Sequence, residues 1–278
     1  MKRLLATLAI LRPHNMLATG ACVACGYHLT GGGNYQAVLI PSLVTALVTG
    51  LGNLINDYYD ADIDRVNRPR RPIPSGRLSA EYVRRVYWAG TVIITPPMIA
   101  MLPVRLWLLM LGWEIMLFLY AYSGKRIPLL GNLLISAIVA SAFVAGAMLT
   151  GHYRLVAFPV AFAFLLVMGR ELVKGAEDIH GDRLAGASTL AVRLGAEKAV
   201  AWASLPLFLC VLAAPLPGLA QLYGRPYTFV VELACVPGIL IAVYVALRSP
   251  QTVALHRPSR ILKLGMLFGI AAIALARV

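Results

Sequence analysis

The chain has 278 residues, of which 59% are hydrophobic and only 13% are charged, and its mean hydropathy is +0.75. Soluble domains carry about 25% charged residues, so this composition excludes an ordinary water-soluble domain and predicts an integral membrane protein. The formal net charge of +13 calls for anionic surroundings, which either nucleic acid or a membrane surface could provide.

Apolar segments of bilayer-spanning length recur along the whole chain. A helix needs about 20 mostly apolar residues to cross the hydrocarbon core. Short connections at 102–104 and 121–132 predict antiparallel neighbouring helices, as in a bundle. We therefore expect an all-α, multi-pass transmembrane bundle of about nine helices, with loops capping its cytoplasmic end and a single domain over 1–278. The predicted spans are 10–30, 36–57, 82–102, 104–121, 132–150, 155–176, 197–216, 227–247 and 260–277.

The basic residues predict the orientation of this bundle. With the N-terminus placed inside, every Lys and Arg falls on the inner side except Arg105, Arg154, Arg225 and Arg277. Such a bias is the positive-inside pattern of membrane proteins. It predicts a cell-membrane protein with a cytoplasmic N-terminus, and it accounts for the net charge without nucleic acid.

The second predicted span ends in the sequence NDYYDADID. Asn56, Asp60 and Asp64 are spaced four residues apart, so a helix running through them presents all three on one face. Asp57 and Asp62 point elsewhere on that helix, and we expect them to be ordinary interfacial residues. The first cluster therefore offers one amide and two carboxylates to a common partner.

The sixth predicted span ends in a second acidic cluster. Asp178 and Asp182 are also four residues apart, with Lys174 one turn earlier and Glu171 one turn before that, and Gly181 predicts the end of the helix. Four spans separate the two clusters, so both lie at the cytoplasmic end. Facing carboxylates repel unless cations lie between them, and Mg²⁺ fits because it takes oxygen ligands and often bridges carboxylates to substrate phosphates.

Basic residues follow both clusters and predict an anion site. Arg68, Arg70 and Arg71 stand in a proline-rich loop after the first cluster, and Lys125 and Arg126 follow the fourth span. Guanidinium groups form paired hydrogen bonds with phosphate, and ammonium groups act as point charges. The sequence holds no P-loop pattern, so we expect an amphiphile with a diphosphate head and a hydrocarbon tail rather than a soluble nucleotide.

A short internal repeat links the two clusters. RLSAE at 77–81 follows the first cluster and RLGAE at 193–197 follows the second, and each opens the next predicted helix. The repeat divides the chain approximately into 36–150 and 155–278. Parallel repeats of this kind place a shared site at their interface.

The doubled acidic motif resembles that of the UbiA superfamily of intramembrane prenyltransferases. The first motif of this family, N-x-x-x-D-x-x-x-D, is matched by Asn56, Asp60 and Asp64. The second, D-x-x-x-D, is matched by Asp178 and Asp182. The resemblance extends over nearly the whole chain, and it implies the same nine-helix fold.

Three further segments carry the resemblance. The loop NRPRRPIPSG places Arg71 before Pro72, as the family does, and Arg12 to Asn15 matches the start of the family. The stretch from Tyr122 to Asn132 also matches, but it is one residue shorter than usual. Both Tyr120 and Tyr122 therefore stay candidates for the tyrosine of the family.

The resemblance implies a magnesium-dependent transfer of a prenyl group from an isoprenyl diphosphate. Two Mg²⁺ ions would bridge the motifs and the diphosphate, and the allylic C–O bond would ionise in a water-poor cavity. Tyr58, Tyr59, Tyr120 or Tyr122 could stabilise the prenyl cation. The implied catalytic residues are Asp60, Asp64, Asp178, Asp182 and Lys125; the metal ligands are Asn56 and the same four aspartates; and the substrate-binding residues are Arg12, Asn15, Arg68, Arg71, Tyr122, Lys125, Arg126 and Lys174.

The second motif, GRELVKGAEDIHGD, is most similar to the archaeal branch of the family. That branch moves a geranylgeranyl group onto geranylgeranylglyceryl phosphate and forms an ether bond in membrane lipid. Its phosphate would need additional cations, for which Arg12, His14, Arg68 and Arg126 are available. The alternatives are an aromatic acceptor for quinone synthesis, such as hydroxybenzoate or dihydroxynaphthoate, and, in a different class, a divalent-cation transporter.

Overall fold

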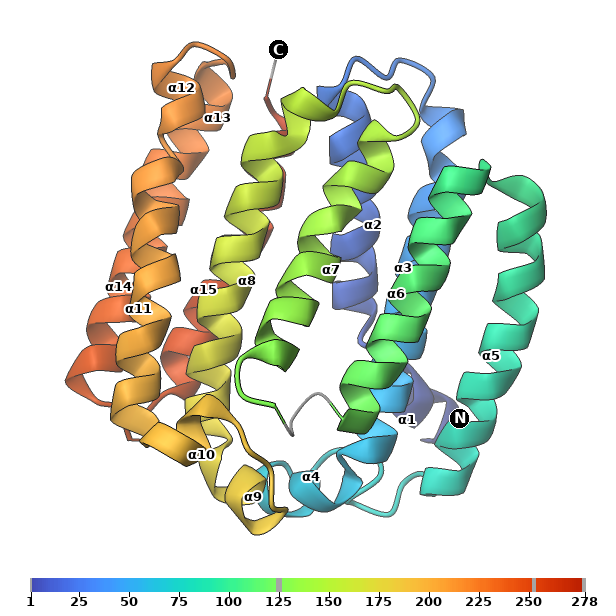
Figure 1. Cartoon of the computed structure of the whole chain (residues 1–278), viewed down its shortest axis with the longest axis vertical. Coiled ribbons are helices and arrows are strands. Elements are labelled where there is room, and N and C mark those ends of the chain that lie inside the picture. Colours follow the sequence, from blue (N-terminus) through green and yellow to red (C-terminus); the bar gives the residue numbers. More distant parts are fainter. Residues whose placement is uncertain (1, 124–126, 252–253, 277–278) are drawn as a thin grey trace.

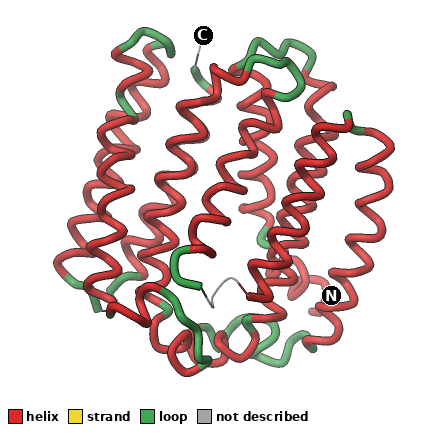
Figure 2. The backbone as a smooth tube through the Cα atoms, viewed as in Figure 1, coloured by secondary structure: helices red, strands yellow, loops and turns green. Residues whose placement is uncertain are grey.

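A computed structural model describes residues 2–123, 127–251 and 254–276 of the chain. Within these ranges the backbone forms helices and connecting loops without any strand (Figure 2). The predicted all-α class is therefore confirmed. Lys125 and Arg126, which the sequence assigns to the anion site, lie outside the described residues.

The helices follow the order of the predicted spans, with short helices between the long ones. In chain order they are α1 (Lys2–Leu11), α2 (Pro13–Leu29), α3 (Tyr35–Tyr59), α4 (Ala61–Asn67), α5 (Ala80–Met101), α6 (Val104–Ser123), α7 (Leu130–Ala147), the 3-10 helix η2 (Tyr153–Val156), α8 (Ala157–Glu177), α9 (Ile179–Leu184), α10 (Leu190–Leu194), α11 (Ala196–Ala213), α12 (Leu216–Leu219), α13 (Arg225–Val230), the π-helix η3 (Val231–Cys235), α14 (Val236–Arg248) and α15 (His256–Ala274).

Six segments of the described chain are long and apolar enough to cross a membrane. The predicted spans 10–30, 82–102 and 260–277 also contain long helices (α2, α5 and α15), but these are not among the six. The structure therefore supports a multi-pass membrane protein, and a total of nine crossings stays a prediction. The six segments are Tyr35–Tyr59, Val104–Ser123, Leu130–Ala147, Tyr153–Glu177, Ala196–Leu219 and Arg225–Arg248.

The first predicted span differs from the structure at its beginning. Helix α1 ends at Leu11, Arg12 adopts a left-handed conformation with φ of 53°, and α2 starts at Pro13. Proline has no N–H to donate and restricts the residue before it, so one continuous helix through 10–30 is broken here. The break directs the Arg12 side chain toward α3, as described below.

The long helices lie side by side, and the short helices gather at the two ends of the bundle (Figure 1). Helices α4, α9 and α10 lie at the same end as the N-terminus, and α12 and α13 lie at the opposite end. Helix α2 packs on α3 and α7, α8 packs on α7 and α11, and α15 packs on both α2 and α8. The contacts of α15 bring the end of the chain against its beginning, around the space that holds the candidate site.

Helices α2 and α7 meet along a seam of two glycines, Gly26 and Gly146. A Cβ atom on Gly26 would lie 2.2 Å from the carbonyl oxygen of Phe143, and one on Gly146 would lie 2.1 Å from that of Val23. The two backbones are therefore in direct contact, as small residues permit between membrane helices. Any larger residue at either position must push the two helices apart.

Candidate active site

The first motif spans a joint between two helices. Helix α3 ends at Tyr59, α4 begins at Ala61, and Asp60 lies between them. The helical hydrogen-bond pattern nevertheless continues, because Asp60 N donates to Asn56 O (2.9 Å) and Asp64 N donates to Asp60 O (2.8 Å). The four-residue spacing is therefore preserved, and Asn56 Nδ2 donates to Asp60 Oδ2 at 3.0 Å.

The second motif has a similar joint between α8 and α9. Asp178 N donates to Lys174 O (2.9 Å), and Asp182 N donates to Asp178 O (3.1 Å). The expectation that Gly181 ends the helix is wrong, because Gly181 lies within α9, which ends at Leu184. Helix α9 packs directly on α4, so the two motifs are brought together as the sequence predicts.

Asn67, which the sequence analysis missed, joins the two motifs. Its Nδ2 donates to Asp178 O at 2.9 Å, and its Oδ1 accepts from Gly181 N at 3.0 Å. A Cβ atom on Gly181 would lie 2.5 Å from Asn67 Nδ2, so only glycine admits this contact. In the sequence Asn67 resembles a turn residue before a proline-rich loop, and no local signal indicates a partner more than a hundred residues away.

Arginines neutralise the carboxylates of the first motif. Arg71 Nη1 donates to Asp64 Oδ2 at 2.5 Å and to Asp57 Oδ1 at 3.2 Å. Arg12 also forms an ion pair with Asp57, and its Nη1 donates to Asn53 Oδ1 at 3.1 Å. The expectation that Asp57 is an ordinary interfacial residue is wrong, because this carboxylate is buried and holds two guanidinium groups. Burial between α1, α3 and the arginine loop is what sequence spacing alone does not reveal.

An arginine from the loop after the first motif pairs with the second motif. Arg68 Nη2 donates to Asp178 Oδ1 at 2.7 Å and lies 3.8 Å from Glu177 Oε1. The basic residues of α8 have another partner: Arg170 Nη1 donates to Glu171 Oε1 at 2.7 Å, and Lys174 Nζ lies 3.7 Å from Glu171 Oε2. Arg68 thus completes the connection that Asn67 makes through its amide.

Burial separates motif carboxylates from ordinary surface acids. Asp60, Asp64 and Asp182 are each less than 10% exposed, whereas Asp62 is exposed and pairs with Arg65 at 2.6 Å. Burial raises the pKa of Asp64 above its usual value, although the charge and hydrogen bond of Arg71 oppose that rise. A buried carboxylate is costly unless it is paired, and Arg71 provides the positive partner of Asp64.

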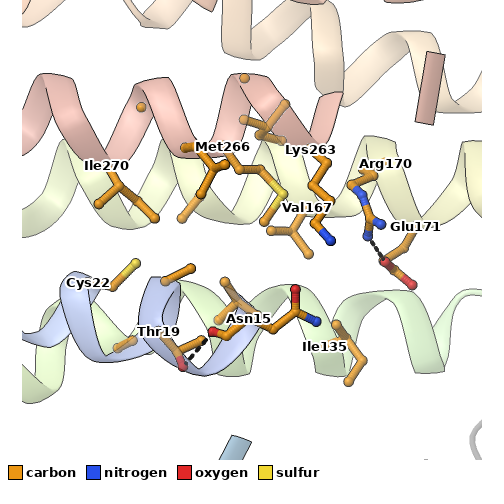
Figure 3. A pocket seen from close by; sticks show the side chains of 18 of the residues that line it. Asn15, Thr19, Cys22, Ile135, Val167, Arg170, Glu171, Lys263, Met266 and Ile270 are labelled. Atoms are coloured by element: carbon orange, nitrogen blue, oxygen red, sulfur yellow. Dashed lines mark hydrogen bonds and ion pairs between the residues drawn. The ribbon is translucent and has the colours of Figure 1, made fainter. Parts of the chain in front are cut away.

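A cavity of about 1060 Å³ opens beside the two motifs. One part of it is apolar, with Trp113, Phe143, Phe162 and Ile270 in the wall. In Figure 3, Thr19 and Cys22 of α2 face Val167, Met266 and Ile270 of α8 and α15, while Arg170, Glu171 and Lys263 gather toward one end. The predicted site residues in its lining are Arg12, Asn15, Asn56, Arg68, Arg71 and Lys174.

The structure separates the two tyrosine candidates. Tyr120 lines the cavity, and the charged groups acting on its hydroxyl include Asp60, Glu171 and Asp182. Tyr122 is not part of that lining; it is 54% exposed and packs edge-on against Tyr59 with ring centroids 5.6 Å apart. The geometry therefore favours Tyr120 over Tyr122 as a tyrosine that can contact a substrate.

The donor atoms of the motifs suit a hard cation. In the part of the chain that the structure describes, no three Asp, Glu, His or Cys side chains converge closely enough to hold one metal ion. Mg²⁺ does not require such a cluster, because it is often held by one or two carboxylates together with waters and substrate phosphates. The oxygen-only set of Asn56, Asp60, Asp64, Asp178 and Asp182 therefore fits Mg²⁺ by ligand type.

Comparison with known proteins gives consistent matches in sequence. A family model described as the UbiA prenyltransferase family matches residues 17–274. The chain is 38% identical over 233 residues to digeranylgeranylglyceryl phosphate synthase of Methanosarcina mazei, across 83% of this chain and 78% of that protein. It is 30% identical over 269 residues to the protein of the same name from Methanosphaera stadtmanae, across 96% and 97% of the two chains.

Solved structures agree with the sequence matches. A structure described for digeranylgeranylglyceryl phosphate synthase in membranes has a TM-score of 0.73 and 25% identity, covering 99% of this chain and 98% of that chain. A UbiA homolog from Archaeoglobus fulgidus, bound to GPP and Mg²⁺, has the same fold with a TM-score of 0.67 and 21% identity, covering 96% and 99%. Both solved structures thus share the fold of this chain.

Proposed function

Because the chain belongs to the UbiA prenyltransferase family, we propose that it transfers a geranylgeranyl group from geranylgeranyl diphosphate to geranylgeranylglyceryl phosphate. The observation that carries this proposal is the cavity, which joins an arginine-lined end beside two acidic motifs to a long apolar interior. Relatives named digeranylgeranylglyceryl phosphate synthase, 30–38% identical over most of both chains, support the choice of acceptor.

The proposed enzyme works in a membrane, with its motifs at the cytoplasmic face. The positive-inside distribution supports this orientation, because α4, α9 and the basic loop after α4 lie at the same end of the bundle as the N-terminus (Figure 1). We also propose that the chain acts as one domain, since both motif segments contribute to a single site. The apolar interior then lies at bilayer depth, where a prenyl tail can enter from lipid.

The donor diphosphate is proposed to bind between the two motifs. Arg68 and Arg71 line the cavity there and offer guanidinium groups from one loop, and Lys174 offers an ammonium group from α8. Lys125 is proposed to complete this set. Arginine suits a diphosphate because its planar group makes paired hydrogen bonds with phosphate oxygens. The structure supports this proposal through the position of the three described residues, each of which already faces a carboxylate partner.

Magnesium is the proposed cofactor, with two ions held by Asn56, Asp60 and Asp64 on one side and by Asp178 and Asp182 on the other. The ligand types support it, as does the Mg²⁺ in the solved Archaeoglobus fulgidus homolog. When bound, Mg²⁺ neutralises the charge that builds on the departing diphosphate. Arg71 and Arg68 would then exchange their present carboxylate partners for phosphate oxygens.

The proposed reaction exchanges one carbon–oxygen bond for another. The allylic C–O bond of the donor breaks, and its electron pair leaves with the diphosphate. The free hydroxyl oxygen of the acceptor glycerol attacks the allylic carbon, a new ether bond forms, and the hydroxyl proton passes to the diphosphate. The role of the protein is to exclude water from the cation and to place the Tyr120 ring, which lines the cavity, beside it.

One assay with two acceptors tests the proposal. Purified protein in detergent receives radiolabelled geranylgeranyl diphosphate and Mg²⁺, together with either geranylgeranylglyceryl phosphate or hydroxybenzoate. We expect labelled diether lipid with the first acceptor and no prenylated product with the second. Product only with hydroxybenzoate would replace this function by an aromatic prenyltransferase of quinone synthesis, and uptake of Mg²⁺ into liposomes without donor would indicate a transporter.

A further inference from the structure

A second polar group in the cavity lining comes from helices rather than from the arginine loop. It comprises Lys263 of α15, His14 of α2 and Arg170 of α8, and α15 packs on both α2 and α8. Lys263 Nζ lies 2.5 Å from His14 Nε2. An ammonium group can only donate, so His14 Nε2 is the acceptor in this hydrogen bond and holds the lysine head in place. Figure 3 shows Lys263 extending between α2 and α8 toward Arg170.

The cations of this group differ from the motif arginines in their partners. Arg68 and Arg71 each bind a motif carboxylate, at 2.7 Å and 2.5 Å. For Lys263, no carboxylate among the described residues lies within the 4.0 Å of an ion pair, and the nearby charges that act on it are Arg12, Arg170 and Lys174. A partly buried ammonium group surrounded by cations is unfavourable unless an anion joins it.

Arg170 adds an unfilled hydrogen-bond donor to this group. Its Nη1 is bound to Glu171, but its Nε is buried and has no hydrogen-bond partner among the described residues. A buried donor without an acceptor costs free energy, which a ligand oxygen can recover. The wall formed by α2, α8 and α15 thus has both excess positive charge and spare donors.

We propose that Lys263, positioned by His14 and assisted by Arg170, binds the phosphate monoester of the acceptor lipid. This inference rests on the proposed function, because it assigns a place to the head group of the acceptor named there. A phosphate monoester carries about −1.5 to −2 charge at neutral pH, so it repels the donor diphosphate unless each head group has its own cations. The cavity lining supplies two such sets, one from the loop after α4 and one from α8 and α15.

The arrangement also explains how the enzyme would choose a lipid phosphate over a neutral alcohol. The reacting hydroxyl group has no charge, so only the phosphate of the acceptor can be attracted by Lys263. When this phosphate is buried beside the Lys263 ammonium group and the Arg170 Nε–H, it gains two cationic partners, and each of them gains an anionic acceptor. A neutral glycerol lipid would leave the cations as unbalanced as they are now, and specificity follows from that penalty.

Two lipids that differ only in the phosphate test the proposal directly. The probes are geranylgeranylglyceryl phosphate and geranylgeranylglycerol, and equilibrium binding of each is measured to the full chain in detergent micelles without donor. We expect the wild-type protein to prefer the phosphorylated lipid and Lys263→Ala to lose about 10- to 100-fold in affinity for it, with little change for the neutral lipid. Lys263→Arg, which keeps the charge, should retain most of the preference.

Matched variants separate a local effect from a general one. Lys198→Ala removes an exposed lysine at the start of α11, outside the cavity lining, and should bind both lipids as wild type does. His14→Gln should weaken the phosphate preference by less than Lys263→Ala, because glutamine can still accept a hydrogen bond from the ammonium. In steady-state assays Lys263→Ala should raise the KM of the phosphorylated acceptor and leave the KM of geranylgeranyl diphosphate unchanged.

Each possible result decides the matter. Equal affinity of wild type for the two lipids, equal losses for both in Lys263→Ala, or a selective rise in the KM of the diphosphate would overturn the proposal. If wild type binds the phosphorylated lipid through Lys263 but forms no ether product, the phosphate site stands and the proposed reaction fails. If the wild type forms the ether product but Lys263→Ala binds the acceptor as the wild type does, the proposed reaction stands and the phosphate site fails.

Discussion

The two acidic motifs are similar in sequence but are neutralised in different ways. The first arm, residues 56–71, contains its own cation, because Arg71 binds both Asp57 and Asp64. The second arm, residues 171–182, uses its own Arg170 and Lys174 on Glu171 and takes Arg68 from the first arm for Asp178. Asn67 of the first arm also binds the backbone of the second. The first arm thus supplies cations to carboxylates of both arms, whereas Asp178 of the second arm depends on Arg68 of the first.

This difference predicts that substitutions in the first arm disturb the second arm more than the reverse. A change in the first arm can disturb both motifs, because Asn67 is the last residue of α4 and Arg68 follows it directly. A change confined to the second arm leaves the pairs of Arg71 with Asp57 and Asp64 in place. Substitutions of the charged side chains, of the asparagine between the arms and of the nearby tyrosine can test this asymmetry.

The largest effects are expected from the motif carboxylates themselves. Asp60→Asn and Asp182→Asn should each lower kcat by about 1000-fold or more, because each removes a buried charge next to the proposed metals. Asp62→Asn is the matched control on α4, since Asp62 is exposed and pairs with Arg65. It should keep wild-type turnover. The radiolabelled transfer assay measures all three, and normal turnover in either of the first two would remove the two-metal interpretation.

Arginine substitutions test the asymmetry most directly. Arg71→Ala removes the guanidinium partner of Asp64 and leaves Asp57 with Arg12, so it should lower the free energy of unfolding by about 3 kcal/mol. Arg68→Ala should cost less, about 1–2 kcal/mol, because Asp178 is more exposed than Asp64. Both should raise the KM of the diphosphate. Denaturant titration in micelles measures the stabilities, and equal losses would contradict the asymmetry.

The bridge between the arms is expected to have an intermediate effect. Asn67→Ala removes two hydrogen bonds to the second arm and should lower kcat by about 10-fold through misplacement of Asp178 and Asp182. Gly181→Ala should have the same effect from the other side, because its Cβ would meet the Asn67 side chain. The double variant should be no worse than either single one. Additive losses would show that the two residues act separately.

The smallest effect is expected from the tyrosine that lies near both arms. Tyr120→Phe removes a hydroxyl influenced by Asp60 and Asp182 but keeps the aromatic ring, so kcat should fall only about three-fold. Tyr122→Phe should change nothing measurable, because Tyr122 does not line the cavity. A larger loss in Tyr122→Phe than in Tyr120→Phe would reverse the assignment that the structure supports.

Much of the fold could be predicted because apolar length and acidic spacing are local properties. The all-helical bundle and the approach of the two motifs follow from where Asp60 and Asp182 stand relative to the spans. The sequence also contains a signal for the break at Arg12, because Pro13 follows it. The length of the apolar segment alone nevertheless favours one continuous helix through both residues.

The missed features depend on contacts between distant segments. Asp57 has the same residue type as Asp62 and stands five positions earlier, yet one is buried between arginines and the other is exposed. The partners Arg12 and Arg71 come from either side of α3, so no pattern within the helix distinguishes the two. Asn67 and Lys263 were missed for the same reason, because the hydrogen-bond partners of each lie in a helix far away in sequence.

The glycine seam between α2 and α7 has a consequence for the route by which lipids travel. In the proposed reaction both substrates carry long tails, and we expect them to enter the cavity sideways from the bilayer. The backbones of α2 and α7 touch at Gly26 and Gly146 and cannot separate without losing that contact, so we expect no lipid to enter between these two helices. Lipid entry is therefore expected between other helices than α2 and α7.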